Sequence, residues 1–233
     1  HRLHGRSRIL SASGNLRKRG RTMNPGAGER LRGLYAISDG PRADLVAACA
    51  AALDGGAALL QYRDKGGDDA RRLREARALQ ALCARRRVPL IVNDDIDLAA
   101  RSGAAGVHLG EHDGEIAAAR ARLGPAAIIG VSCYDSLERA RQSAAAGADY
   151  LAFGAFFASP TKPHARLATP RLLREAKPLG LPLVAIGGIT HDNAQSLLEA
   201  GADAVAVISA LFGAADVRAA ARRFAGLFES ARR

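Results

Sequence analysis

One pattern occurs eight times along this chain: a short apolar run, a polar or glycine-rich turn, and a stretch rich in Ala, Arg and Leu with helical spacing. The apolar runs predict buried strands, and the longer stretches predict helices. Strands that alternate with helices pair in parallel through right-handed crossovers. The predicted strands cover residues 34–38, 58–63, 90–94, 106–110, 128–133, 150–156, 183–188 and 204–209. The predicted helices cover about 42–53, 68–86, 95–102, 114–122, 136–146, 169–177, 191–200 and 213–229.

Eight strand–helix units in 233 residues match the count of a closed (β/α)8 TIM barrel at the short end of its size range. We therefore predict an α/β fold with a single barrel domain over residues 31–233 and no linker. The alternative is an open doubly wound sheet, but no G-x-G-x-x-G follows the first predicted strand. Hydrophobic residues make up 48% of the chain and aromatic residues only 4%, which fits a core of small aliphatic side chains between helices and a sheet.

The formal charge of +11 would suggest a nucleic-acid partner if it were evenly spread. Residues 1–22 hold seven Lys and Arg and no acid, which leaves only +4 for the other 211 residues. Residues 1–30 are therefore predicted to be a basic, disordered extension. It is either an upstream or cloning-derived segment before a natural start at Met23, or an organelle transit peptide. We expect small phosphorylated substrates as partners, with no nucleic acid and no membrane.

The three cysteines are widely spaced and odd in number, which is typical of reduced core residues rather than of a disulfide framework. They are Cys49, Cys83 and Cys133. No apolar stretch has the length needed to cross a bilayer, and no secretory signal is present in the sequence. A cytoplasmic location is the resulting prediction.

Polar groups follow two neighbouring predicted strands. Asn93 and Asp94 come directly after the apolar run at 90–92, and Asp113 follows the run at 106–110. In such barrels the chemistry lies at the carboxyl ends of the strands, where these side chains would meet. Carboxylates there suit Mg2+, which takes one or two of them and leaves positions for phosphate oxygens and water. The alternative is that these residues cap the helices that follow.

The second predicted strand ends in Gln61, Arg63 and Lys65, which alternation sends to one side. An amide, a guanidinium and an ammonium at a barrel mouth would hold the edge of a heterocycle and an oxyanion. The alternative is a solvated charged loop. Gln61 counts against it, because that residue lies within the apolar strand.

Residues that suit phosphate binding follow the last three predicted strands. Ser159, Thr161 and Lys162 lie in a loop stiffened by two prolines, where hydroxyls would direct and Lys would neutralise a phosphate. The alternative is a proline-rich surface turn. The paired glycines at 187–188 let the backbone come close to a ligand, and the loops after strands seven and eight often form a phosphate site.

Two further residues need separate interpretations. Ser132 could hydrogen-bond a ligand inside the mouth, while Cys133 should face the other way. His108 and His112 match the H-x-x-E-H zinc-protease pattern, but that chemistry requires a helix, whereas a strand is predicted here. His108 instead either orients a ligand or is a hydrogen-bonded core residue. No sequence resembles the elbow that carries an activated nucleophile.

Together, these motifs resemble the thiamine-phosphate synthase family over about residues 33–229. The resemblance is carried by Gln-x-Arg-x-Lys at 61–65, Asn-Asp at 93–94, Val-His-Leu-Gly at 107–110 with Asp113, Ser132, Ser-Pro-Thr-Lys at 159–162, Gly-Gly-Ile at 187–189 and Ile-Ser at 208–209.

The resemblance implies a TIM-barrel transferase that joins hydroxymethylpyrimidine diphosphate to hydroxyethylthiazole phosphate and releases diphosphate. It implies Mg2+ as cofactor, held by Asp94 and Asp113. The pyrimidine diphosphate would be bound by Gln61, Arg63, Lys65, Asn93, Ser132 and Lys162. The thiazole phosphate would be bound by Ser159, Thr161, Gly188, Ile208 and Ser209. Among these, the predicted catalytic residues are Ser132, Lys162 and Arg63.

Two departures from the family pattern are visible. Glu111 stands where the family commonly has Gln and adds a negative charge near the diphosphate, and Ser159 stands where Thr is frequent. Two alternative functions remain on the same barrel. A thiazole tautomerase would not need the metal carboxylates, and a non-catalytic phosphate-binding barrel would bind ligand without turnover.

Overall fold

The computed structural model describes residues 31–111, 115–158 and 167–230. Its eight strands are β1 (Gly33–Ile37), β2 (Leu59–Tyr62), β3 (Leu90–Asn93), β4 (Gly106–Leu109), β5 (Ile128–Tyr134), β6 (Tyr150–Phe153), β7 (Leu183–Ile186) and β8 (Ala204–Val207). The helices are α2 (Leu45–Asp54), α3 (Asp69–Arg86), α4 (Ile96–Ser102), α5 (Ile116–Leu123), α6 (Leu137–Ala146), α7 (Pro170–Ala176), the 3-10 helix η1 (Lys177–Leu179), α8 (His191–Glu199), α9 (Ser209–Phe212) and α10 (Val217–Ser230).

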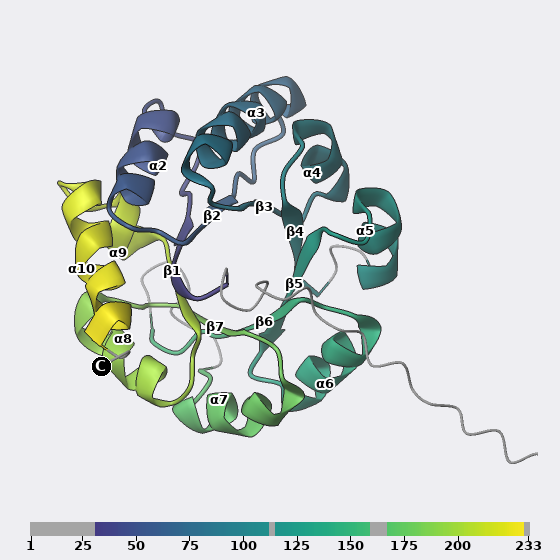
Figure 1. The fold of residues 1–233 in the computed structure, drawn as a ribbon, viewed down its shortest axis with the longest axis vertical. Coiled ribbons are helices and arrows are strands. Elements are labelled where there is room, and N and C mark those ends of the chain that lie inside the picture. Colours follow the sequence, from purple (N-terminus) through teal and green to yellow (C-terminus); the bar gives the residue numbers. More distant parts are fainter. Residues whose placement is uncertain (1–30, 112–114, 159–166, 231–233) are drawn as a thin grey trace, which may run out of the picture.

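The strands form one closed barrel in chain order, and every neighbouring pair is parallel. Closure is made by β1 and β8, where Gly33 pairs with Ala204 and Ala36 with Val207. Figure 1 shows the helices as a ring outside the strands. The predicted TIM barrel is confirmed, and the open doubly wound sheet is wrong.

Alternation along each strand separates two apolar layers. Outward side chains such as Leu60 and Tyr62 pack under the helices, and inward ones such as Tyr35, Ile91 and Tyr150 fill the barrel. Tyr150 occupies space that β5 leaves open, because a Cβ at Gly130 would lie only 1.9 Å from the tyrosine ring. The barrel interior is therefore packed, but part of its filling is polar.

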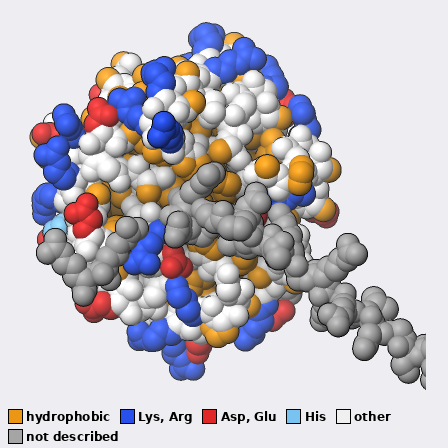
Figure 2. Space-filling view, viewed as in Figure 1, with side chains coloured by type: hydrophobic (Ala, Val, Ile, Leu, Met, Phe, Trp, Pro, Cys, Tyr) orange, Lys and Arg blue, Asp and Glu red, His pale blue; other side chains and the backbone are white. Residues whose placement is uncertain are grey.

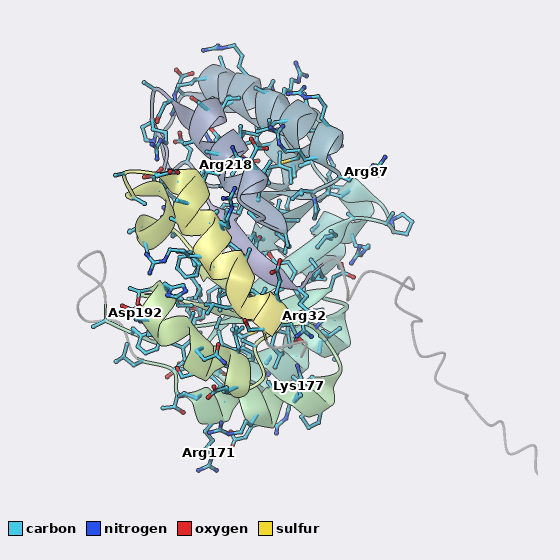
Figure 3. The ribbon with its side chains drawn as sticks, turned by 60° about the vertical axis from the view of Figure 1, so that its left-hand side comes forward. Arg32, Arg87, Arg171, Lys177, Asp192 and Arg218 are labelled. Atoms are coloured by element: carbon cyan, nitrogen blue, oxygen red, sulfur yellow. The ribbon has the colours of Figure 1, made fainter. Side chains whose placement is uncertain are left out.

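The last helix packs against the first described helix and so completes the outer ring of helices. Helix α10 lies against α2, and a Cβ at Gly55 would lie 2.5 Å from Cβ of Ala221. Figure 3 shows labelled charged side chains, including Arg218 and Lys177, around the outside of the helices. Figure 2 shows Lys and Arg spread over one face with Asp and Glu among them, rather than gathered in one patch.

The predicted strands run three residues past the end of β6 at Phe153 and two residues past the ends of β7 and β8, and β8 is followed by a helix that was not predicted. The predicted strand at 204–209 ends at Val207, and the predicted helix at 213–229 is α10, preceded by the short helix α9. Ile208 is the N-cap of α9, with φ −112° and ψ −83°, so Ser209 begins a helix instead of ending a strand. The apolar run continues through Ile208, and for that reason periodicity alone does not reveal the strand end.

The three cysteines are buried and free, as predicted. Burial raises the pKa of Cys133 to about 11, and its side chain packs on the outer side of β5. In the described part of the chain, no helix combines the length and apolarity needed to cross a membrane.

Candidate active site

At the end of β2, successive side chains point alternately into the barrel and toward the surrounding helices. Gln61 is 2% exposed and points inward, where its Nε2 donates to the Tyr35 hydroxyl at 2.9 Å. Tyr62 points outward and donates to Glu75 at 2.6 Å. The predicted alternation is therefore confirmed for the strand.

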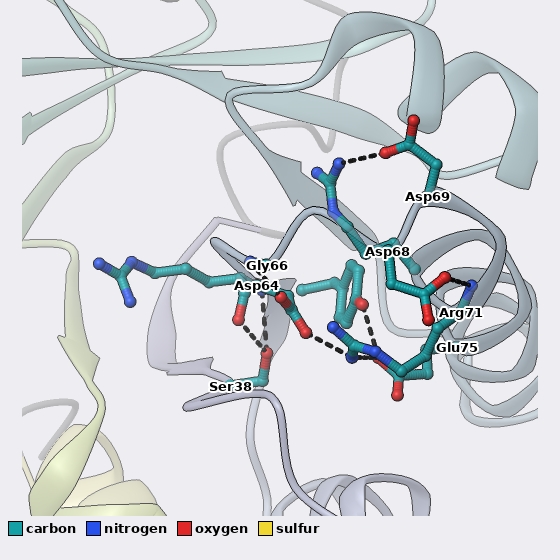
Figure 4. Close-up of polar contacts among 10 residues, drawn as sticks. Ser38, Asp64, Gly66, Asp68, Asp69, Arg71 and Glu75 are labelled. Atoms are coloured by element: carbon teal, nitrogen blue, oxygen red, sulfur yellow. Dashed lines mark hydrogen bonds and ion pairs between the residues drawn. The ribbon is translucent and has the colours of Figure 1, made fainter.

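Beyond the strand, Asp64 is tied back to helix α3. Its side chain accepts from Arg71 at 2.6 Å and from the backbone N–H of Gly66 at 2.6 Å (Figure 4). The Arg71 hydrogen bond lowers the pKa of Asp64 below its usual value. This anchor holds the loop that carries Arg63 and Lys65, and Ser38 adds a second one by accepting from the backbone N–H of Arg63 at 2.9 Å.

Asp94 joins the ends of β2 and β3. Its Oδ2 accepts from Lys65 Nζ at 2.5 Å and from Asn93 Nδ2 at 2.7 Å. The backbone of Asp94 has φ +64°, a strained conformation for a residue with a side chain. Helix α4 is capped by Asp95, which accepts from Leu98 N at 2.8 Å. The cap of α4 is therefore Asp95, the residue after Asp94, and the capping alternative is wrong for Asp94.

His108 and Ser132 meet inside the barrel. His108 Nε2 lies 2.8 Å from Ser132 Oγ, and Nδ1 lies 2.8 Å from the Tyr150 hydroxyl. Burial lowers the pKa of His108 to about 4, so the imidazole is neutral at pH 7. The strand position predicted for His108 is confirmed. His108 lies in β4, so this described segment is not the helix that the zinc-protease pattern requires. His112 lies outside the described residues.

The loops after β7 and β8 place backbone near the mouth. Gly188 has φ +64°, and a Cβ there would lie 2.5 Å from the Phe157 carbonyl oxygen. Asn193 fixes this turn: its Nδ2 donates to the Gly188 carbonyl at 3.0 Å, and its Oδ1 accepts from Thr190 N at 2.8 Å. Ser209 is exposed in the first turn of α9.

Hydrogen bonds in the structure thus connect several of the predicted site residues. One set of contacts joins Lys65, Asn93 and Asp94, and another joins Gln61 to Ser132 through buried side chains. Arg63 is half-buried in the anchored loop, and Gly188, Ile208 and Ser209 follow the ends of β7 and β8. Four predicted residues lie outside the described residues: Asp113, Ser159, Thr161 and Lys162.

Within the described part of the chain, no three His, Cys, Asp or Glu residues form a metal-binding cluster. Asp94 still suits Mg2+, because it offers a hard oxygen ligand at the barrel mouth. Its Oδ1 accepts no hydrogen bond from the described residues, while Oδ2 is held by Lys65 and Asn93. One carboxylate with phosphate oxygens and water is a set that this ion accepts.

The sequence alone did not identify Tyr35 and Tyr150, two buried residues whose hydroxyls contact the predicted site. Their hydroxyls lie 2.8 Å apart inside the barrel, between Gln61 and His108. A tyrosine at an inward strand position, level with an inward histidine, was the available signal. A surface pocket lined in part by Thr190, His191 and Phe224 shares no residue with the predicted site.

Comparison with known proteins decides the family. The family model for thiamine monophosphate synthase matches residues 34–211. The chain belongs to the thiamine monophosphate synthase family.

Relatives within this family match nearly their full length. The chain is 59% identical over 201 residues to the thiamine-phosphate synthase of Chromobacterium violaceum, covering 85% of this chain and 97% of that protein. It is 55% identical over 204 residues to the thiamine-phosphate synthase of Nitrosococcus oceani, covering 86% and 94%. The solved thiamine phosphate pyrophosphorylase of Pyrococcus furiosus superposes with a TM-score of 0.78 at 36% identity, covering 86% of this chain and 97% of that chain. The predicted resemblance is confirmed, and the chain is a transferase of this family.

Proposed function

We propose that this chain condenses hydroxymethylpyrimidine diphosphate with hydroxyethylthiazole phosphate to give thiamine phosphate and diphosphate, with Mg2+ as cofactor. The observation that carries the proposal is the contact of Lys65 and Asn93 with Asp94, which joins a cation, an amide and a carboxylate at one barrel mouth. The family and its relatives support the same reaction.

The reaction replaces a carbon–oxygen bond with a carbon–nitrogen bond. The bond from the pyrimidine methylene to the diphosphate breaks, and its electron pair leaves with the diphosphate. The resulting cation is stabilised by the pyrimidine ring, and the thiazole nitrogen then bonds to the methylene carbon. Such a path needs positive charge around the leaving group, and it needs no general base.

The cationic side chains of this chain fit that requirement. Arg63 and Lys65 come from the anchored loop after β2, and Lys162 is the predicted third cation. A fixed charge aimed at developing negative charge is worth about 3 kcal/mol, or roughly a hundredfold in rate. Ser132 and Gln61 would hold the pyrimidine ring from inside the barrel.

Asp94 and Asp113 would hold the metal, which supplies charge neutralisation of the leaving diphosphate when bound. The second phosphate would lie at the ends of β6 to β8. There Ser159 and Thr161 would offer hydroxyls, and Gly188 and Ser209 would offer backbone N–H groups near the first turn of α9.

The direct experiment mixes the purified protein with both phosphorylated substrates and Mg2+ and measures thiamine phosphate by chromatography. We expect product that requires both substrates and is abolished by excess chelator. Binding of both ligands without product would support a non-catalytic barrel. Interconversion of thiazole isomers without condensation would support a tautomerase, an alternative that the relatives do not favour.

We also propose a cytoplasmic location. Three buried, free thiols support it, because secreted proteins commonly pair their cysteines.

A further inference from the structure

Five side chains form one hydrogen-bonded series through the barrel interior. Gln61 Nε2 donates to the Tyr35 hydroxyl at 2.9 Å, and the Tyr35 and Tyr150 hydroxyls lie 2.8 Å apart. The Tyr150 hydroxyl lies 2.8 Å from His108 Nδ1, and His108 Nε2 lies 2.8 Å from Ser132 Oγ. The series thus joins two residues that are predicted to bind the pyrimidine, Gln61 and Ser132. Its members come from strands β2, β1, β6, β4 and β5.

Burial isolates the middle of this series from water. Tyr35 is 1% exposed, Tyr150 0% and His108 8%. A phenol has one proton to donate, and a neutral imidazole has one donor and one acceptor nitrogen. Each group must therefore use its neighbour in the series, because an unpaired polar group in this interior is costly.

With Gln61 as the donor to Tyr35, these constraints fix the direction of every other hydrogen bond in the series. Because Gln61 donates to Tyr35, the Tyr35 proton goes to Tyr150, and the Tyr150 proton goes to His108 Nδ1. His108 then carries its proton on Nε2 and donates it to Ser132. Ser132 is left with its own O–H, and Gln61 is left with its carbonyl oxygen, to offer to a ligand.

In the intact series the Gln61 amide can rotate by half a turn only if both tyrosine hydroxyls turn as well and His108 moves its proton from Nε2 to Nδ1. Gln61 would then offer N–H groups, and Ser132 would offer a lone pair. The two ends are therefore coupled: one presents an acceptor when the other presents a donor.

We propose, on the basis of the function proposed above, that Tyr35, Tyr150 and His108 are positioning residues that set the hydrogen-bonding polarity of Gln61 and Ser132 and thereby select an aminopyrimidine over its oxo analogue. The amine is a donor and matches the Gln61 carbonyl, and a ring nitrogen is an acceptor and matches the Ser132 O–H. A carbonyl in place of the amine presents an acceptor to an acceptor. Sites that hydrogen-bond a substrate discriminate strongly against a mismatched group.

The kinetic test compares kcat/KM of the full chain for the natural pyrimidine diphosphate with that for the analogue in which a carbonyl replaces the amine. In Tyr150→Phe the series is broken, so Gln61 is free to rotate. We expect the preference for the amine to fall at least about tenfold. The KM for the thiazole phosphate should change less than about twofold, because that substrate does not meet the series.

The matched control is Tyr62→Phe. Tyr62 is also a buried strand tyrosine, but its hydroxyl donates to Glu75 on the outer side of β2. Tyr62→Phe should leave the preference unchanged. A second variant, Tyr35→Phe, should lower the preference as Tyr150→Phe does, and the double variant should add little. Equal loss of activity toward both pyrimidines in Tyr150→Phe would overturn the proposal.

A nitrogen-15 NMR measurement on the ligand-free protein separates this proposal from the proposed function. We expect His108 in the wild-type protein to be protonated at Nε2 and unprotonated at Nδ1, and Tyr150→Phe to populate both tautomers. A proton on Nδ1 in the wild-type protein would overturn the assigned direction. Failure of the wild-type protein to make thiamine phosphate would instead contradict the proposed function, without altering the tautomer result.

Discussion

The two ends of the barrel use aspartate in different ways. At the base, Asp149 Oδ2 accepts from Ile129 N at 2.8 Å and from Arg120 at 2.6 Å, and Asp203 Oδ2 accepts from Leu183 N at 2.9 Å. At the mouth, Asp94 Oδ2 is held by side chains. A backbone N–H at a strand start cannot move away, whereas a lysine side chain can rearrange around a ligand. The carboxylates at the base therefore stabilise the barrel. The Asp94 carboxylate at the mouth can exchange its side-chain partners for a ligand.

The largest expected effect at the mouth is that of Asp94→Ala. We expect kcat/KM for thiamine phosphate formation to fall at least about a hundredfold, because Lys65 loses its partner and the proposed metal loses a ligand. The free energy of unfolding should change by less than about 1 kcal/mol, since the pair is partly exposed. Steady-state kinetics over a range of Mg2+ and urea unfolding measure both.

The control at the mouth is Asp95→Ala, one residue along the chain. It removes the N-cap of α4 and should cost about 1 kcal/mol of stability with nearly full activity. Full activity of Asp94→Ala would remove Asp94 from the proposed metal site.

The converse result is expected at the base for Asp149→Ala. The substitution leaves the N–H of Ile129 and the Arg120 guanidinium without this acceptor, so we expect a loss of about 2–3 kcal/mol in the free energy of unfolding. The KM values of the remaining folded enzyme should stay unchanged. Asp192→Ala is the control, because Asp192 is exposed at the start of α8. A tenfold rise in a KM with unchanged stability would contradict the division between the two ends.

A smaller effect is expected for Gly188→Ala, which tests how closely the mouth loops approach each other. The new Cβ would lie 2.5 Å from the Phe157 carbonyl oxygen, so the turn must shift. We expect KM for the thiazole phosphate to rise about tenfold, with a smaller change for the pyrimidine diphosphate. Gly180→Ala is the control: φ is also positive there, but a Cβ would meet nothing within 4 Å. It should cost only about 1 kcal/mol of stability.

The comparison between the ends also shows what the sequence alone can predict. Gly-Ala-Asp recurs at 147–149 and 201–203, soon after the ends of α6 and α8, and Gly147 is the left-handed C-cap of α6. The pattern does not reveal what the two aspartates contact. Asp149 accepts from a backbone N–H near the start of β5, and Asp203 accepts from one at the start of β7. These contacts depend on strand register across the closed barrel, which periodicity does not specify.

At the mouth, alternation correctly predicts the inward direction of Gln61 and the outward direction of Cys133. The end of β8 at Val207 is missed, because Ile208 continues the apolar run. The tyrosines between Gln61 and His108 are missed for a different reason. Each lies in an ordinary apolar strand, and only closure of the ring brings β1, β4 and β6 close enough to bond through the centre.

The smallest expected effect concerns Glu111, which stands where the family commonly has Gln. Its backbone N–H donates to the Tyr134 hydroxyl at 3.3 Å, and the residue is exposed. An exposed charge is screened by salt within about 10 Å, so its influence on the proposed metal should be weak. We expect Glu111→Gln to raise the Mg2+ concentration for half-maximal activity by less than about threefold, with the difference shrinking as salt is added. A rise beyond about tenfold that persists in high salt would show that Glu111 bonds the metal directly, and the mouth would then have a third acidic ligand.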